Sequence, residues 1–231
     1  MKLKCIGSGS SGNSYALIDN DNKILLLDLG LPAKEIKRAI DFRISDVVGA
    51  VVTHHHKDHS LAVADFEKIG IPVWQPYLDE KTYQRKQFGK FNFQCFDLPH
   101  NGTPNRGFLI EVDGQKILYM TDFEYCPFKF TTQKINHILV ECNYQQELVD
   151  RDLPNYEHKI RGHCSLSTCK DFIKANVTDN LQTVILCHLG RGTTEPEECA
   201  AEINKIVPQA NVFVAKKGLE IELRKKGECP F

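Results

Sequence analysis

Strand-like and helix-like runs of hydrophobic residues alternate along the chain. Near the N-terminus, three short apolar runs at residues 2–6, 15–18 and 23–28 are bounded by polar residues, and Asp19-Asn20-Asp21-Asn22 separates the last two. Runs of this kind predict the strands of an N-terminal meander. Pro32 then opens a predicted helix, because the apolar positions that follow it fall on one side.

The run Val47-Val48-Gly49-Ala50-Val51-Val52 is apolar throughout, which predicts a buried strand. A helix is expected to begin near Ser60. Further strands are predicted over residues 91–96, 108–112, 116–120, 138–141, 183–188 and 212–215, and helices over residues 165–175 and 196–206. Strands and helices mixed in this order predict two packed sheets with helices outside.

Length and composition indicate a soluble globular protein. The 231 residues contain no repeat or linker-like segment, so we expect one domain over residues 1–231. No apolar stretch approaches the roughly 20 residues that a membrane span needs, and the N-terminus lacks the pattern of a signal peptide. These features predict a cytoplasmic protein without a membrane span.

Cysteine content and net charge argue against a disulfide framework and against a broad basic surface. The nine cysteines are odd in number and include no Cys-x-x-Cys pair, so reduced core thiols are expected. Among them, Cys164 is expected to pack inward. A net charge of −1 argues against one broad basic face for duplex nucleic acid, although a local groove is compatible with it.

The strongest chemical signal is Thr53-His54-His55-His56-Lys57-Asp58-His59, directly after the apolar run. In an extended segment alternate side chains share a face, so His54 and His56 point the same way and can hold one metal ion. Asp58 and His59 follow where the chain turns, and can offer an oxygen and a nitrogen to a second ion. Nitrogen and carboxylate ligands without thiolates suit zinc, with manganese or iron as alternatives.

Three more candidate ligands occur at the ends of predicted strands: His100, Asp122 and His188. Taken singly, Asp122 could be a turn residue or a helix cap, and His188 a hydrogen-bonded core histidine. Together the three repeat one pattern, a ligand-capable side chain at the exit of an apolar strand. That repetition favours a shared metal site.

With these residues the chain resembles the metallo-β-lactamase-fold hydrolases, in the family's order and over nearly its whole length, and Leu27-Asp28-Leu29-Gly30 matches the family's acidic turn. The resemblance implies an α/β fold, an αββα sandwich of two mixed sheets with helices outside. It also implies two divalent metal ions. His54, His56 and His100 would hold the first ion, Asp58, His59 and His188 the second, and Asp122 would bridge them.

Three local features resemble the phosphodiesterase and exonuclease branch of the family. The loop with Ser10, Ser11 and Asn13 is similar to that of small bacterial members; it is either a phosphate-binding loop or a flexible turn. His163 resembles the His-x-Ser element by which nucleases such as ribonuclease Z place an extra imidazole over the scissile phosphate. Glu141 resembles an acidic element of the same relatives, and we expect it to orient His163.

The resemblance implies a reaction in which two ions about 3.5–4 Å apart activate a bridging hydroxide as the nucleophile. Asp58 would accept its proton, and His163 would stabilise developing charge or protonate the leaving oxygen, a contribution of about 10²–10⁴-fold. The expected partner is a phosphodiester substrate, either single-stranded DNA, a short oligonucleotide or a small molecule. The native metal and the oligomeric state stay open at this stage.

Two other hypotheses fit the same ligands. A thioester hydrolase of the glyoxalase II type would share every metal ligand, but it gives no reason for His163 or the serine-rich loop. A non-catalytic binding protein that retains the fold would be expected to have lost at least one ligand position. One departure from the family's pattern is Asn101, which follows His100 where many relatives carry an acidic residue.

Overall fold

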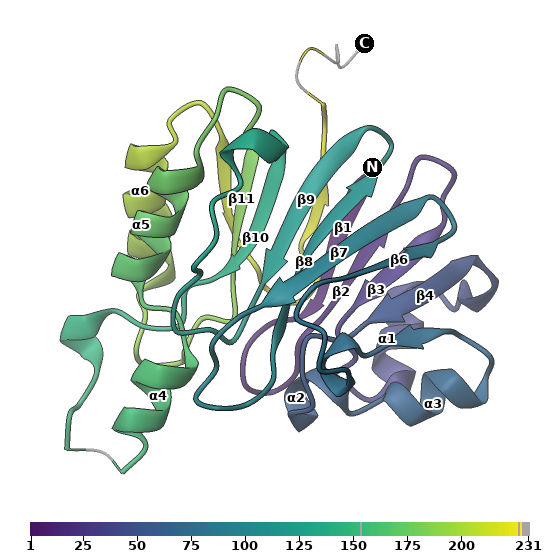
Figure 1. The fold of residues 1–231 in the computed structure, drawn as a ribbon, viewed down its shortest axis with the longest axis horizontal. Coiled ribbons are helices and arrows are strands. Elements are labelled where there is room, and N and C mark those ends of the chain that lie inside the picture. The colour runs from purple at the N-terminus through teal and green to yellow at the C-terminus, as the bar shows by residue number, and fades with distance from the viewer. Residues whose placement is uncertain (153, 226, 228–231) are drawn as a thin grey trace.

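The computed structural model describes residues 1–152, 154–225 and 227, and shows two β-sheets packed against each other with helices on both outer faces (Figure 1). This arrangement is the predicted αββα sandwich. The first sheet has the order β13 (Glu220–Glu222), β1 (Lys2–Gly7), β2 (Ser14–Ile18), β3 (Ile24–Leu27), β4 (Val47–Val51) and β5 (Val73–Trp74). Strands β3, β4 and β5 run parallel, whereas the pairs that involve β1 and the β2–β3 pair are antiparallel.

The second sheet is also mixed. Its order is β12 (Asn211–Val214), β11 (Thr183–Cys187), β10 (His137–Glu141), β9 (Gln115–Met120), β8 (Arg106–Val112), β7 (Phe91–Asp97) and β6 (Gln84–Phe88). Strands β9 to β12 are parallel, and β6 to β9 form antiparallel pairs. The carboxyl ends of β9, β10 and β11 therefore meet at one edge.

The helices cover the outer faces and this edge. In Figure 1, α5 (Leu166–Asn176) and α6 (Pro196–Ile206) lie against the second sheet, and α1 (Ala33–Ala39) and α3 (Val63–Lys68) against the first. The short helices α2 (Lys57–Ser60) and α4 (Tyr156–Gly162) lie at the lower end of the sandwich in that view. Single turns of 3₁₀-helix occupy Ile44–Asp46, Pro76–Leu78, Thr131–Gln133 and Gln146–Leu148.

The continuous apolar runs of the sequence reflect burial on both faces of each sheet. On β9, Tyr119 belongs to the core between the sheets, whereas its neighbours Leu118 and Met120 belong to the core under α5 and α6. On β3, Leu25 faces the inter-sheet core and Leu26 the core under α1 and α3. Successive strand side chains point to opposite faces, so a strand buried on both sides needs apolar residues at every position.

Several elements differ from the sequence predictions. Instead of one helix near Ser60, α2 begins at Lys57 and α3 at Val63, so Asp58 and His59 lie in a helical turn. Strands β5 and β6, the three-residue strand β13 and helix α4 were not predicted. Strand β5 has two residues, β6 is an edge strand of mostly polar residues, and α4 buries only Gly162, so none carries an apolar pattern.

The thiol prediction is confirmed for the cysteines that the structure describes. All eight are unpaired, and Cys164 is fully buried, as expected. Cys229 lies outside the described residues. None of the helices in the described ranges combines the length and the apolar character that crossing a bilayer requires.

Candidate metal centre and its surroundings

Three site residues begin the loops that leave buried strands, and all three have left-handed backbone. Asp28 follows β3 with φ of 57°, Asp122 follows β9 with φ of 53°, and His188 follows β11 with φ of 49°. This conformation is sterically costly for residues other than glycine, and it occurs preferentially at functional sites. Each strand thereby turns sharply at its end and directs a polar side chain into one region.

The first predicted ligand group comes together as a compact cluster of imidazoles. Nδ1 of His56 lies 3.0 Å from Nε2 of His54 and 3.2 Å from Nε2 of His100. His54 and His100 are buried, whereas His56 is half-buried. The ligand atoms of the three residues lie within 4.8 Å of one another, which suits a single cation.

Hydrogen bonds on the far side of the rings fix which nitrogen can act as a ligand. The Nδ1–H of His100 donates to the carbonyl oxygen of Gly162 at 2.6 Å, which leaves the lone pair on Nε2. Nδ1 of His54 lies 3.0 Å from Oγ1 of Thr53, whose hydroxyl is 3.1 Å from both oxygens of Asp28. The hydroxyl therefore donates to Asp28 and accepts from His54. Such outer partners orient metal-binding histidines in known metalloproteins.

The second group contains Asp58, His59, Asp122 and His188. Nε2 of His59 lies 3.5 Å from Oδ2 of Asp58 and 3.3 Å from Oδ1 of Asp122. Its other nitrogen, Nδ1, donates to Oδ2 of the fully buried Asp28 at 2.7 Å. A carboxylate behind an imidazole raises the basicity of the nitrogen that faces the ligand.

A buried ring nitrogen of His188 that lacks a hydrogen-bond partner is consistent with a cation in this group. Its Nδ1 lies 2.8 Å from both Asp122 Oδ1 and Glu141 Oε1, whereas its buried Nε2 has no hydrogen-bond partner among the described residues. Buried ring nitrogens are normally paired. Nε2 lies 3.8 Å from Oδ2 of Asp58, so a cation between them would satisfy both.

Charge in the site also favours cations. Burial lowers the pKa of His54, His56 and His100, so these imidazoles are neutral with free lone pairs. At Asp122 burial works against the anion, but His188 and His59 outweigh it and hold the pKa well below its usual range. The neutral nitrogens of His54, His56 and His100 beside the ionised carboxylate of Asp122 match the donor set that zinc takes in proteins. His59 and His188, whose pKa values are raised by the neighbouring carboxylates despite burial, would give up a proton to a bound cation.

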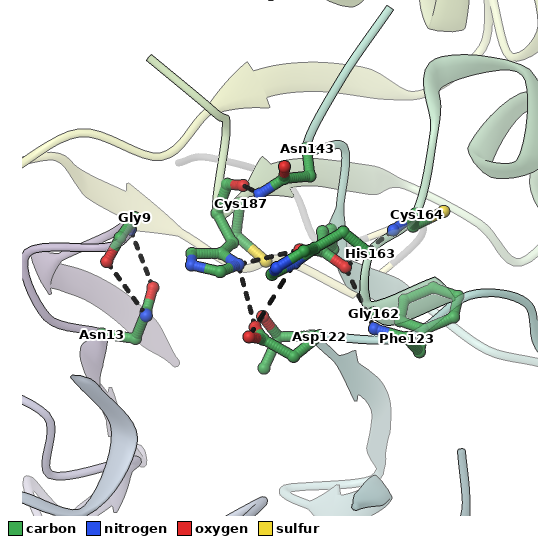
Figure 2. Close-up of polar contacts among 12 residues, drawn as sticks. Gly9, Asn13, Asp122, Phe123, Asn143, Gly162, His163, Cys164 and Cys187 are labelled. Carbon is green, nitrogen blue, oxygen red and sulfur yellow. Dashed lines mark hydrogen bonds and ion pairs between the residues drawn. The ribbon is translucent and has the colours of Figure 1, made fainter. Parts of the chain in front are cut away.

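His163 and Glu141 form a pair beside the second group. Burial works against the anion of Glu141, but the neighbouring His163 outweighs it and lowers the pKa of the carboxyl. Oε1 of Glu141 lies 2.8 Å from Nδ1 of His163, and Oε2 accepts from the backbone N–H groups of Phe123 and Cys164 at 3.1 and 3.0 Å (Figure 2). Four donors thus hold this carboxylate, since Nδ1 of His188 is the fourth.

The N-terminal loop is folded on itself. The side chain of Asn13 accepts from the N–H of Gly9 at 2.8 Å and donates to its carbonyl at 3.1 Å (Figure 2). It also lies 3.0 Å from Nε2 of His59, and it is fully buried. Ser10 lines the cavity over the site, whereas Ser11 is exposed and is not among the cavity-lining residues. Of the three predicted phosphate-loop residues, Ser10 therefore has access to a ligand.

A cavity of about 740 Å³ opens over the centre. Predicted ligands His56, Asp58, His100, Asp122 and His188 line it together with His163. The rest of its wall includes Asn143 after β10, Lys159 of α4, and Arg191 and Thr193 of the loop between β11 and α6, none of which sequence reasoning singled out. In the sequence, the only indication that these four residues belong to the site is that they lie near Glu141, His163 and His188.

Comparisons with known proteins place the fold. The chain is 23% identical over 248 residues to exodeoxyribonuclease YycJ of Bacillus anthracis, covering 94% of this chain and 92% of the relative. Among solved structures, the metallo-β-lactamase-fold protein YhfI of Bacillus subtilis has a TM-score of 0.73 at 16% identity, covering 95% of this chain and 98% of that one. The short form of human tRNase Z has a TM-score of 0.64 at 15% identity and covers 97% and 100%.

The family model described as the metallo-beta-lactamase superfamily matches residues 7–133. The match includes the histidine cluster, His100 and Asp122, which the structure brings together at one edge of the sandwich. Because it spans more than half of the 231 residues, the chain belongs to the metallo-β-lactamase superfamily.

Proposed function

We propose that the protein is a metal-dependent hydrolase of phosphodiester bonds that acts on DNA. The observation that carries this proposal is the pair of His163 and Glu141 beside the two ligand groups. A metal centre alone would serve any hydrolase of the family. An extra imidazole, held through Nδ1 at 2.8 Å by a buried carboxylate and lining the cavity, supplies a proton donor for a leaving alkoxide.

The metal part of the proposal assigns two divalent ions, zinc or alternatively manganese or iron. His54, His56 and His100 would hold one, and Asp58, His59 and His188 the other. Asp122 would bridge them, since Oδ2 lies 3.8 Å from His54 Nε2 while Oδ1 lies 3.3 Å from His59 Nε2. When bound, two such ions lower the pKa of a water between them and neutralise the oxygens of a phosphate.

The protein's own groups would handle the protons. Asp58 lines the cavity, and its pKa is lowered because His59 outweighs the effect of burial, so it is ionised and able to accept a proton. His163 is oriented by Glu141 with its second nitrogen left for the cavity, where it would hold a proton next to the leaving oxygen.

DNA is proposed as the substrate because the exodeoxyribonuclease relative aligns over nearly the whole of both chains. Single-stranded DNA or a short oligonucleotide would fit a cavity of about 740 Å³ that is open to solvent. We also propose a cytoplasmic location, consistent with the unpaired cysteines among the described residues.

The test of this function compares His163→Ala with His55→Ala, an exposed histidine outside the three ligand groups. Hydrolysis of bis-p-nitrophenyl phosphate and of a 5′-labelled single-stranded DNA would be measured with zinc or manganese, alongside bound metal. We expect His163→Ala to keep its metal and to lose about 10²–10⁴-fold in kcat. His55→Ala should behave as wild type. Equal rates for all three proteins would remove the role assigned to His163.

A further inference from the structure

One wall of the cavity carries cations that the proposed reaction does not use. Helix α4 contributes Lys159, and the loop between β11 and α6 contributes Arg191. The same cavity is lined by five of the metal-ligand candidates and by His163. A cavity of about 740 Å³ has room for more of a substrate than one phosphodiester group.

Lys159 is half-buried and lacks an anionic partner. Its ammonium donates to Oδ1 of Asn143 at 2.7 Å and to Oγ1 of Thr193 at 3.2 Å, both of them neutral acceptors. The centroid of the Tyr144 ring lies 5.8 Å from the ammonium, and no carboxylate of the described residues lies within 4 Å of it. Burial lowers the pKa of Lys159, an effect that the more distant Glu141 opposes only in part. A partly desolvated charge without a counter-ion is costly, so the missing partner is expected to be an anion on the ligand.

The position of Lys159 is fixed relative to the metal-ligand candidates by Asn143. The amide of Asn143 accepts from Lys159 and donates to the carbonyl oxygen of His188 at 2.8 Å; Figure 2 shows this side chain directed at the end of β11. The Asn143 carbonyl accepts from the N–H of Gly190 at 2.9 Å, and a Cβ at position 190 would lie 2.4 Å from that oxygen. The loop therefore packs closely against Asn143 and carries Arg191 with it.

Arg191 is exposed at the mouth of the same cavity. Within the described part of the chain its guanidinium makes no hydrogen bond or ion pair. Besides the ligand candidates Asp58 and Asp122, the carboxylate of Asp150 lines the cavity, and its Oδ1 accepts from the backbone N–H of Asp152 at 2.9 Å. The wall thus offers one fixed and one free cation, the arrangement that binds phosphate oxygens through charge-assisted hydrogen bonds.

We propose that Lys159 and Arg191 form a subsite for a second phosphate group of a nucleic-acid strand, next to the phosphate that is cut. The inference rests on the proposed function and extends it from phosphodiesters in general to substrates with at least two phosphates. The second phosphate is either a terminal monophosphate or the next internal phosphodiester, which share the same oxygens.

The test compares thymidine substrates that differ only in the extra phosphate. TpT has one phosphodiester; pTpT and TpTp add a 5′ or a 3′ terminal phosphate, and TpTpT adds an internal one. For the wild type we expect kcat/KM to rise about ten- to hundredfold with at least one of these additions, and the gain to shrink as salt is raised. Lys159→Met and Arg191→Met should reduce the ratio between the better substrate and TpT, and Lys159→Arg should retain part of it.

The matched control is Lys174→Met, an exposed lysine of α5 paired with Asp171, which should keep the wild-type ratio. A purely structural role for Lys159 would lower the rates on all substrates equally and leave the ratio unchanged, which would overturn the inference. A wild type that cleaves TpT and bis-p-nitrophenyl phosphate without any gain from a second phosphate would also overturn it while the proposed function stands. If the wild type cleaves no phosphodiester, both fail.

Discussion

Replacement of Asp28 by asparagine should weaken one metal position without touching any ligand. Asp28 is fully buried behind the centre, and its backbone is left-handed, a conformation that asparagine tolerates equally well. The substitution keeps size and shape while it turns one acceptor oxygen into a donor amide. Its effects can therefore be assigned to hydrogen bonding.

Both oxygens of Asp28 are fully used by donors. Oδ1 accepts from the backbone N–H of Thr53 at 2.8 Å, and Oδ2 accepts from Nδ1 of His59 at 2.7 Å and from the hydroxyl of Tyr119 at 2.5 Å. An amide facing Thr53 leaves a buried N–H without an acceptor. An amide facing His59 drives the ring to the tautomer with its proton on Nε2, the nitrogen proposed as a ligand.

The expected magnitude follows from these losses. Loss of the partner behind a metal-binding histidine typically reduces metal affinity about 10–100-fold. A buried donor without an acceptor costs about 1–3 kcal/mol of stability. We therefore expect the ion held by Asp58, His59 and His188 to bind about 10–100-fold more weakly. The ion held by His54, His56 and His100 should be weakened less, because Asp28 reaches that group only through the hydroxyl of Thr53.

The assay is a zinc titration of the metal-free protein against a chromogenic chelator, with stoichiometry read from both binding phases. The matched control is Asp19→Asn, another buried aspartate whose Oδ1 accepts two backbone N–H groups, but in a turn away from the centre. It should lose stability and keep both metals. Two ions bound with wild-type affinity in Asp28→Asn would refute the reasoning about the tautomer of His59.

Three further predictions concern protons, capping and metal removal. Burial lowers the pKa of His137 to about 3. Below pH 6.5 the unfolded chain therefore binds a proton at this residue, whereas the folded chain stays unprotonated there until the pH approaches 3. The stability from this residue is complete above pH 6.5 and is lost as the pH falls toward 3; between pH 7 and 5 the loss is about 2 kcal/mol. His137→Gln should remove that slope in urea unfolding, and an unchanged slope would contradict it. Ser165 accepts from the backbone N–H of Thr168 at 3.0 Å and caps α5, so Ser165→Ala should cost about 1 kcal/mol by chemical denaturation, against Ser167→Ala on the exposed face as the neutral control. In the metal-free protein burial disfavours the imidazolium of His188, but Asp122 and Glu141 outweigh it and raise its pKa to about 10. Metal must displace that proton and the proton of His59, whose pKa Asp122 and Asp28 raise despite burial, so affinity should rise at least about tenfold per pH unit between pH 6 and 8 in calorimetry. An affinity independent of pH would refute this.

The clustering of the candidate ligands could be predicted because their spacing is local and their chemistry is distinctive. His54 and His56 share one face of an extended segment, and Asp122 and His188 sit where apolar strands end, so the sheet edge brings them together. Strands β9, β10 and β11 could be predicted because a strand that is buried on both faces requires an uninterrupted apolar run.

Lys159 and Asn143 were not readable in that way. Lys159 belongs to a seven-residue helix that buries only a glycine, so no hydrophobic period marks it. Asn143 acts through contacts with Lys159 and His188, residues 16 and 45 positions away along the chain. Asn13 was predicted to contact a phosphate, but its side-chain amide points inward to Gly9 and His59. Side-chain partners at long sequence separation are set by tertiary packing.

A comparison of kcat/KM for two ester classes with metal-loaded wild-type protein would decide between a phosphodiesterase and a thioesterase. Bis-p-nitrophenyl phosphate and a 5′-labelled single-stranded DNA represent phosphodiesters, and S-lactoylglutathione represents thioesters. We expect metal-dependent cleavage of the phosphodiesters, abolished by a chelator, and little thioester hydrolysis. Thioester hydrolysis without cleavage of either phosphodiester would contradict this expectation and would leave the imidazole of His163 without its proposed role.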